Sequence, residues 1–164
     1  MEVNFTLDKI RETAAGLLAK TPMFKVFAFH GDMGAGKTTF TRGLGEGLQV
    51  RGPVTSPTFV LARTHPSLVG GAPLVHVDAY RLDDAMALDD LDIDFVNSVV
   101  VVEWGRGKVD QFVDSWLDIE IERPEGVAVI EGDDDLVEER VVRILPHRSE
   151  EHTSELQSPD LISY

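Results

Sequence analysis

Apolar residues along the chain fall into short uninterrupted runs and into stripes at helical spacing. Residues 26–29 (VFAF) and 99–102 (VVVV) are continuous apolar runs of strand length, a pattern typical of strands buried on both faces of a sheet. Residues 8–20 carry apolar side chains on one helical face, and Thr6 before them suits an N-cap. A second helix is expected at residues 40–48. Strands alternating with helices predict an α/β fold.

Weaker apolar segments predict the remaining elements. Strands are expected at residues 1–5, 59–63, 74–77, 116–121, 127–131 and 140–145, the last three as parts of a meander or sheet edge. The acidic stretch 82–94 is expected to form one or two short helices whose aspartates form a solvated face. Another short helix is expected near residues 109–112. The chain shows no internal repeat, and residues 1–147 are predicted to form one domain.

The predicted helix at residues 40–48 contains Gly43, Gly45 and Gly47. Glycine lowers the stability of an isolated helix by about 1 kcal/mol per residue relative to alanine. Burial against the sheet is therefore expected to hold this helix in place.

Composition narrows the function classes. The formal net charge is −14 in 164 residues, and a strongly acidic chain is a poor stand-alone binder of nucleic acid. Any role near RNA is therefore expected to run through a partner, although solubility alone also explains the acidity. The chain has no cysteine, so it has neither a disulfide framework nor a thiolate metal site, which is compatible with the expected cytoplasmic location. It also has no apolar run of about 18 residues and no signal-peptide pattern.

The last residues differ in character from the rest. Residues 148–158 read RSEEHTSELQS and resemble the conceptual translation of a common sequencing adapter. We therefore expect residues 148–164 to be a non-native tail, with a disordered polar tail as the alternative.

The most informative motif lies between the first buried strand and the second helix. Gly31, Gly36, Lys37 and Thr38 fill the fixed positions of the phosphate-binding pattern G-x-x-x-x-G-K-[ST]. Such a loop points backbone N–H groups at phosphate oxygens and ends at a helix N-terminus that favours anions. The lysine would reach the β- and γ-phosphates, and the threonine hydroxyl would ligate Mg²⁺. A glycine-rich turn that binds nothing is the alternative.

Two further carboxylates follow predicted strands. Asp78 comes after residues 74–77, and Glu103 comes after the strand at 99–102. Ligands of open α/β sheets bind at the carboxyl ends of strands, so either side chain would suit Mg²⁺ or a polarised water. Glu103 is the stronger candidate. Capping of a neighbouring helix, or a pair with Arg81, is the alternative.

Other polar residues near the motif are ambiguous. Thr55, Ser56 and Thr58 would offer a hydroxyl to Mg²⁺ or to the γ-phosphate, or else belong to a plain proline-rich connector. His30 and His76 flank the same region and are assigned no catalytic role. Trp104, next to Glu103, is expected to pack rather than to stack on a base.

Four motifs in this order, GDMGAGKTT, TSPTF, HVDAYRL and VVVVEWG, closely resemble the bacterial TsaE family, formerly called YjeE. The resemblance covers about residues 5–122. It implies a three-layer P-loop NTPase fold, with a central, mostly parallel sheet flanked by helices and with antiparallel C-terminal strands. It also implies an ATPase needed for the N6-threonylcarbamoyladenosine modification of tRNA.

The resemblance also implies ligands, partners and residue roles. ATP would be bound by Gly31, Gly34, Ala35, Gly36, Lys37, Thr38 and Thr39. Thr38 and Glu103 would hold Mg²⁺, and Asp78 and Glu103 would serve hydrolysis. Residues 55–58 would form a nucleotide-sensitive loop. The expected partner is the TsaB–TsaD pair, with tRNA contacted only indirectly and with no role for DNA or a membrane.

Departures from the family pattern are modest, and rival functions remain. Met33 stands where the family often has leucine, His30 precedes the loop, and the C-terminal end lacks a family match. A small-molecule kinase would need an acceptor pocket and an arginine-rich lid, for which Arg81, Arg106 and Lys108 are the candidates. A GTPase is disfavoured because no N-K-x-D stretch exists. A nucleotide-gated binding module with negligible turnover is the third rival.

Overall fold

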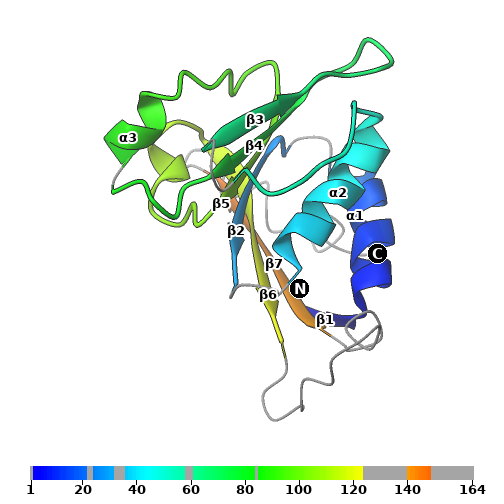
Figure 1. Cartoon of the computed structure of the whole chain (residues 1–164). Helices are drawn as coiled ribbons and strands as arrows, with labels where there is room; N and C mark the ends of the chain where they lie inside the picture. Colours follow the sequence, from blue (N-terminus) through cyan, green and yellow to red (C-terminus); the bar gives the residue numbers. More distant parts are fainter. Residues whose placement is uncertain are drawn as a thin grey trace.

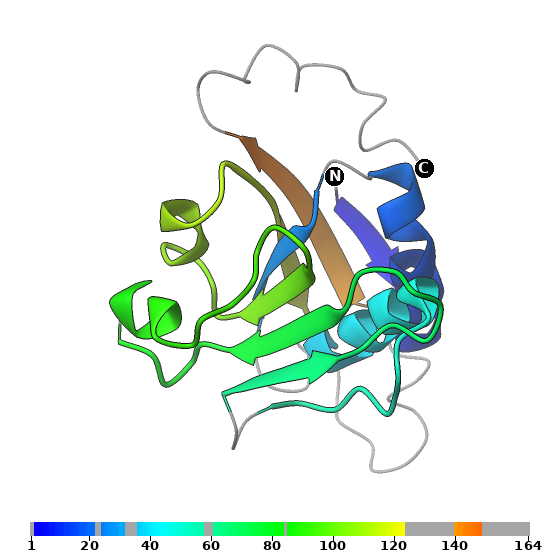
Figure 2. The ribbon, with the colours of Figure 1, turned by 90° about the horizontal axis from the view of Figure 1, so that it is seen from above.

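A central sheet with helices on both faces forms the framework of the molecule (Figures 1 and 2). The computed structural model describes residues 2–21, 24–31, 36–57, 61–83, 85–123 and 140–148. Its helices are α1 (Leu7–Lys20), α2 (Lys37–Leu48), α3 (Ala85–Asp89) and the 3₁₀ turn η1 (Val109–Gln111). Its strands are β1 (Glu2–Phe5), β2 (Val26–His30), β3 (Ala62–His65), β4 (Leu74–Asp78), β5 (Val99–Glu103), β6 (Ser115–Glu122) and β7 (Arg140–Arg148).

The seven strands lie in the order β1-β7-β6-β2-β5-β4-β3. The four central strands β6, β2, β5 and β4 are mutually parallel, whereas β7, β1 and β3 join by antiparallel pairing. This arrangement confirms the predicted α/β class with a mostly parallel sheet and antiparallel C-terminal strands.

Each face of the sheet has its own apolar core. The face under α1 and α2 is lined by Phe27, Phe29, Val101 and Ile119, together with Phe40 of α2. The opposite face carries Ala28, Val77 and Val102, which pack against residues of the α3 and η1 regions. Figure 2 shows the α1–α2 pair and the α3–η1 pair on opposite sides of the strands. Because β2 and β5 pack against a core on each face, residues 26–29 and 99–102 are continuous apolar runs.

Helix α2 is held by α1 as well as by the sheet. A Cβ atom at Gly43 would lie 2.3 Å from the carbonyl oxygen of Arg11, and one at Gly47 would lie 2.2 Å from that of Ala15. A Cβ at Gly45 would instead meet Val54 at 3.1 Å. The expectation that burial against the sheet stabilises this helix is therefore incomplete, because two of the three glycines let the backbones of α1 and α2 approach each other closely.

Several element boundaries differ from the expected ones. Strand β3 begins at Ala62 because Leu61 has φ 64°, which interrupts extended backbone. The acidic stretch contains one described helix, α3, and β7 extends to Arg148, which pairs with Ser115. The strand expected at 127–131 and residues 149–164 lie outside the described residues.

None of the helices in the described ranges is both long and apolar enough to cross a membrane.

The close approach of α1 and α2 predicts the effect of enlarging Gly43. We expect Gly43→Ala to destabilise the protein, because an overpacked core costs about 1–3 kcal/mol and alanine regains only about 1 kcal/mol of helix propensity. Gly16→Ala, in α1, is the matched control, since a Cβ there meets nothing within 4 Å. Urea unfolding of both variants measures the difference. A Gly43→Ala protein as stable as Gly16→Ala would contradict the packing described here.

Candidate functional site

Three parallel strands end side by side at one edge of the sheet. In the strand register, Glu103 is paired with Phe29 of β2 on one side and with Asp78 of β4 on the other. The chain after β2 enters the phosphate-loop motif at Gly31. The sheet thus brings together the start of the motif and both strand-end carboxylates, in the place where open α/β sheets bind ligands.

The two ends of the phosphate-loop motif have the backbone geometry of a tight turn. Gly31 has φ 151° and Gly36 has φ 120°. Only glycine adopts such positive angles without strain, which accounts for glycine at both positions. Gly36 is the N-cap of α2, and its carbonyl accepts the amide of Phe40 at 2.9 Å. Two of the residues expected to bind phosphate, Gly34 and Ala35, lie outside the described residues.

Lys37 is held in place at the first position of α2. Its Nζ donates a hydrogen bond to the carbonyl oxygen of Gly31 at 2.7 Å and lies 4.1 Å from the centre of the Trp104 ring. The residue is only 8% exposed. A buried ammonium group needs such partners, and the carbonyl and the aromatic face supply them. The Lys37 side chain therefore connects the two ends of the phosphate-loop motif, and its ammonium group is held beside Gly31.

The threonines of α2 lie in its first turns. Thr38 and Thr39 are partly buried, while Thr41 is fully buried and its Oγ1 donates to the carbonyl of Lys37 at 2.9 Å. The hydroxyl of Thr41 is thus used within the helix. Thr38, the residue expected to ligate Mg²⁺, is next to Lys37 at the N-terminal end, where the helix dipole favours anions.

Glu103 is a buried carboxylate. The residue is 4% exposed, and its Oε2 lies 3.4 Å from Nε2 of His76, within ion-pair distance but not aligned as a hydrogen bond. Its backbone carbonyl accepts the amide of Ala79 at 2.9 Å, which fixes the end of β5 against the chain leaving β4.

Asp78 has a local structural contact. Its Oδ1 accepts the backbone amide of Tyr80 at 3.0 Å, which closes a turn directly after β4. Its own amide donates to the carbonyl of Leu61 at 2.8 Å. This turn differs from both structural alternatives considered for Asp78, a helix cap and a pair with Arg81, and its role in hydrolysis stays a prediction.

Trp104 packs over the ammonium group of Lys37, a contact that the sequence did not predict. Its backbone has φ 61°, and its amide donates to the carbonyl of Phe29 at 2.8 Å. This left-handed turn directs the ring toward Lys37, and Tyr80 lies against the ring with centroids 5.2 Å apart. A positive φ is uncommon for a bulky residue and is found where surrounding contacts enforce it.

The proline-rich segment 52–57 is tied to its neighbours. Arg42 of α2 donates from Nε to the carbonyl of Val54 at 2.9 Å, and Arg63 of β3 donates from Nη1 to Oγ1 of Thr55 at 3.1 Å. Thr58, the last hydroxyl of the expected nucleotide-sensitive loop, lies outside the described residues. The contacts of Val54 and Thr55 fit a connector, and they also link the segment to α2.

Comparison with known proteins decides the family. The family model described as "Threonylcarbamoyl adenosine biosynthesis protein TsaE" matches residues 6–129. The chain belongs to the TsaE family. It is 62% identical over 99 residues to a TsaE protein of Streptomyces coelicolor, and this match covers 58% of the chain and 67% of the relative. It is 40% identical over 101 residues to a TsaE protein of Bacillus subtilis, covering 60% of the chain and 61% of the relative.

A solved structure supports the fold of this TsaE-family chain. The crystal structure of Bacillus subtilis YdiB superposes with a TM-score of 0.61 at 27% sequence identity, covering 94% of this chain and 90% of YdiB. A TsaE protein of Mycobacterium bovis is 45% identical over 107 residues, or 60% of the chain and 64% of the relative. Both the likeness to YdiB and the family membership agree with the P-loop NTPase fold expected from the motifs.

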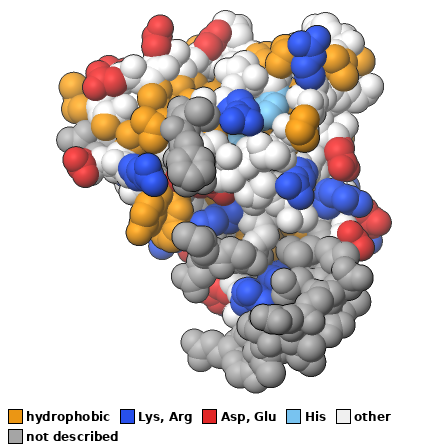
Figure 3. Space-filling view, viewed as in Figure 1, with side chains coloured by type: hydrophobic (Ala, Val, Ile, Leu, Met, Phe, Trp, Pro, Cys, Tyr) orange, Lys and Arg blue, Asp and Glu red, His pale blue; other side chains and the backbone are white. Residues whose placement is uncertain are grey.

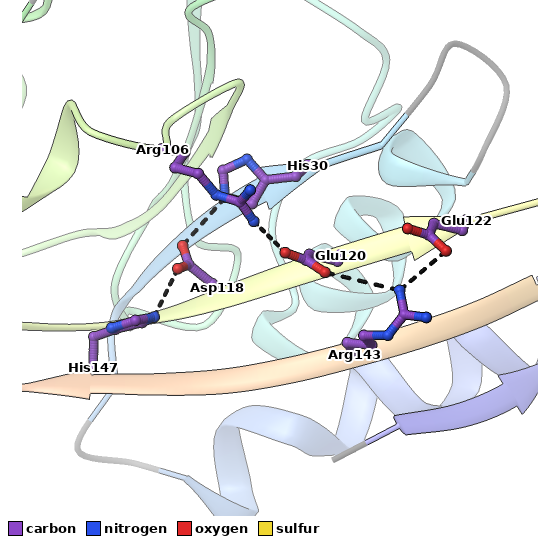
Figure 4. A network of polar contacts seen from close by, with 7 residues as sticks. All are labelled: His30, Arg106, Asp118, Glu120, Glu122, Arg143 and His147. Atoms are coloured by element: carbon purple, nitrogen blue, oxygen red, sulfur yellow. Dashed lines mark hydrogen bonds and ion pairs between the residues drawn. The ribbon is translucent and has the colours of Figure 1, made fainter.

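A second polar cluster lies on the sheet face opposite α1 and α2. Figure 4 shows it running along β6 between β2 and β7. Asp118 accepts a hydrogen bond from Nε2 of His30 at 3.2 Å, and its other oxygen lies 2.7 Å from Nε2 of His147. The cluster continues from Glu120, which contacts Arg106 and Arg143, to Glu122. Since His30 directly precedes Gly31, the cluster anchors the strand end from which the phosphate-loop motif starts.

Hydrogen bonding and electrostatic interactions determine the pKa of Asp118. Burial alone would raise the pKa of its carboxyl group, but the hydrogen bond from His30, the electrostatic interactions with His147 and His30, and a hydrogen bond from Trp116 outweigh burial and hold the pKa below its ordinary value. At neutral pH the carboxylate is therefore ionised. Trp116 stacks on the His147 ring, with centroids 5.0 Å apart, and steadies one of these neighbours.

Sequence reasoning missed three features of this region. It did not find the contact of Lys37 with Trp104, the burial of His76 against Glu103, or the clamp of Asp118 by two histidines. A tryptophan directly after a strand-end carboxylate was a signal for the first. The other two bring together residues far apart in the chain, so local sequence patterns carry no sign of them.

The lowered pKa of Asp118 predicts a dependence of stability on pH. A group whose folded pKa is below its unfolded pKa stabilises the protein above the unfolded pKa, and this stabilisation is lost as pH falls through the folded pKa. We therefore expect Asp118→Asn to lower the free energy of unfolding at about pH 5, and the gap to the parent protein to close toward about pH 2. Urea unfolding across this range measures it, with exposed Asp114→Asn as control. A pH-independent gap would contradict the assignment.

Proposed function

We propose that this chain is a Mg²⁺-dependent ATPase that serves the N6-threonylcarbamoyladenosine modification of tRNA together with the TsaB–TsaD pair. Membership of the TsaE family supports the pathway, because the family model and the curated relatives carry threonylcarbamoyladenosine biosynthesis in their names. The matches span about two thirds of those relatives, so activity and partners of the whole protein belong to the proposal.

One observation carries the ATPase proposal: a fixed lysine at the start of α2 and a buried carboxylate at the end of β5 are both tied to the end of β2. Lys37 is oriented by Gly31 and Trp104, and Glu103 lies in register with the last residues of β2. A cation for phosphate oxygens and an acidic group for a metal or water are the two parts that phosphoryl transfer needs beside the backbone of the loop.

The donor set suits Mg²⁺ bound together with a nucleotide. A threonine hydroxyl at position 38 and the carboxylate of Glu103 are the oxygen donors Mg²⁺ prefers. Among the described residues, no group of three or more His, Asp or Glu side chains is placed to hold a metal. Mg²⁺ typically takes its remaining ligands from substrate phosphates and water rather than from a protein cage. When bound, the ion would neutralise the charge that develops on the phosphates.

Asp78 has a place in the same proposal. It lies beside Glu103 in register, and the turn closed by its Oδ1 fixes the orientation of its side chain. A carboxylate oriented in this way would hold a water by hydrogen bonding at the strand ends. The role we assign to Asp78 is to orient the water that attacks the γ-phosphate.

The surface supports action through a partner rather than by direct grip on RNA. The chain carries a net charge of −14. On the face drawn in Figure 3, the basic side chains of the described residues are spread over the surface among uncharged and acidic ones. Phosphate contacts from gathered Lys and Arg side chains dominate affinity for nucleic acid, so we assign tRNA contact to the partner pair.

The rival kinase function loses support at the residues it would use. Lys108 donates from Nζ to the backbone carbonyl of Ala79 at 2.8 Å, and Arg106 contacts Glu120. Two of the three cationic candidates for a lid are therefore engaged in holding local structure, although Arg81 is exposed.

The central test is ATP hydrolysis by the full chain, alone and with the TsaB–TsaD pair. We expect slow turnover that the pair raises, and we expect Lys37→Ala to weaken ATP binding by at least about 2 kcal/mol, or roughly thirtyfold, because a charged hydrogen-bond donor is lost. Exposed Lys9→Ala on α1 is the control. ATP binding without turnover in either condition would favour a gated binding module, and phosphate transfer to small acceptors would favour a kinase.

Replacing Glu103 separates metal chemistry from nucleotide binding. We expect Glu103→Gln to lower Mg²⁺-dependent turnover by about a hundredfold, because an electrostatic contribution to the transition state is removed. Binding of ATP in the presence of a chelator should change little. Normal hydrolysis by this variant would show that Glu103 does not hold the metal.

A further inference from the structure

His76 is a fully buried histidine beneath the candidate metal carboxylate. It is 0% exposed and lies on β4, where its pairing with Val101 places it on the same sheet face as Glu103, two residues farther along β5. Leu74, Val99 and Val101 on this face belong to the core under α1 and α2. The imidazole therefore sits among apolar side chains, with the Glu103 carboxylate at 3.4 Å and the buried His65 of β3 as polar neighbours.

Burial of this ring costs free energy that an apolar residue would not. Neither ring nitrogen of His76 has a hydrogen-bond partner among the described residues. A buried polar group without a hydrogen bond costs about 1–3 kcal/mol, so valine or leucine would serve packing better. His65 on β3 differs in part: its Nε2 also has no hydrogen-bond partner among the described residues, but its Nδ1 bonds the carbonyl of Arg51 at 3.2 Å and links β3 to the preceding loop.

We infer that His76 is a positioning residue whose buried ring orients the carboxylate of Glu103 for the divalent cation. This inference rests on the proposed function. The close contact of Nε2 with Oε2 restricts rotation of the Glu103 side chain, so its carboxylate has fewer orientations to sample. Groups that orient a metal-binding carboxylate typically change metal affinity 10–100-fold when they are removed.

The test compares the Mg²⁺ requirement of nucleotide binding in two substitutions at one position. His76→Phe keeps a buried ring but removes the nitrogen, while His76→Gln places an amide nitrogen near the position of Nε2. We expect His76→Phe to raise the Mg²⁺ concentration that half-saturates binding of a fluorescent ATP analogue by about tenfold. In His76→Gln this Mg²⁺ concentration should stay close to that of the parent protein. Binding in a chelator should be the same in all proteins.

Matched controls separate positioning from loss of structure. His65→Phe and His65→Gln change another buried histidine of the same sheet that is not in contact with Glu103, and both should leave the Mg²⁺ requirement unchanged. Circular dichroism and thermal unfolding show that each variant is folded. Equal Mg²⁺ requirements in His76→Phe and the parent protein would overturn the inference.

A metal-free readout tests the contact itself. In the parent protein without Mg²⁺ or nucleotide, we expect Glu103→Gln to shift the ring nitrogen resonances of His76 and to leave those of His65 in place. Unchanged His76 resonances would overturn the inference. Failure of the parent protein to bind nucleotide in a Mg²⁺-dependent manner would instead contradict the proposed function, so the two failures are distinguishable.

Discussion

Parallel pairing of β2 with β5 is the constraint on which the rest of the site depends. The register from Val26 with Val100 to Phe29 with Glu103 is continued by the hydrogen bond from the Trp104 amide to the Phe29 carbonyl. Burial on both faces fixes this register, because a slip by one residue would move every side chain to the other core. The pairing of β2 with β5 alone therefore places the start of the phosphate-loop motif next to Glu103.

The position of helix α2 in turn fixes the position of Lys37. Its N-terminus starts at Lys37, and its axis is fixed by close backbone contact with α1 through Gly43 and Gly47. The glycines that weaken the helix in isolation are therefore the residues that let it pack. On the other face of the sheet, Asp118 ties the end of β2 to β7 through its two histidine neighbours. The start and the end of the motif are thus anchored by different layers of the molecule.

The sequence was sufficient for the fold class and for most elements, because the apolar runs at 26–29 and 99–102 match β2 and β5 closely. It also pointed to Lys37, Asp78 and Glu103 as neighbours, since strand ends of a parallel sheet share an edge. It did not predict features that depend on a residue with left-handed backbone or on contacts between distant parts of the chain. The φ angle of Leu61 shifted the start of β3, and the burial of His76 depends on pairing between strands more than twenty residues apart.

The lysine of the phosphate-loop motif is not a bare positive charge open to solvent. Its ammonium group already has a carbonyl and an indole face as neighbours. An anion that engages Lys37 has to exchange with these internal partners, so the observed affinity is a difference between two sets of contacts. A lone phosphate offers little in that exchange, whereas a ligand that also contacts the loop backbone gains more. If the motif binds phosphate as proposed, these internal contacts of Lys37 would favour a ligand that also contacts the loop backbone over a lone phosphate ion.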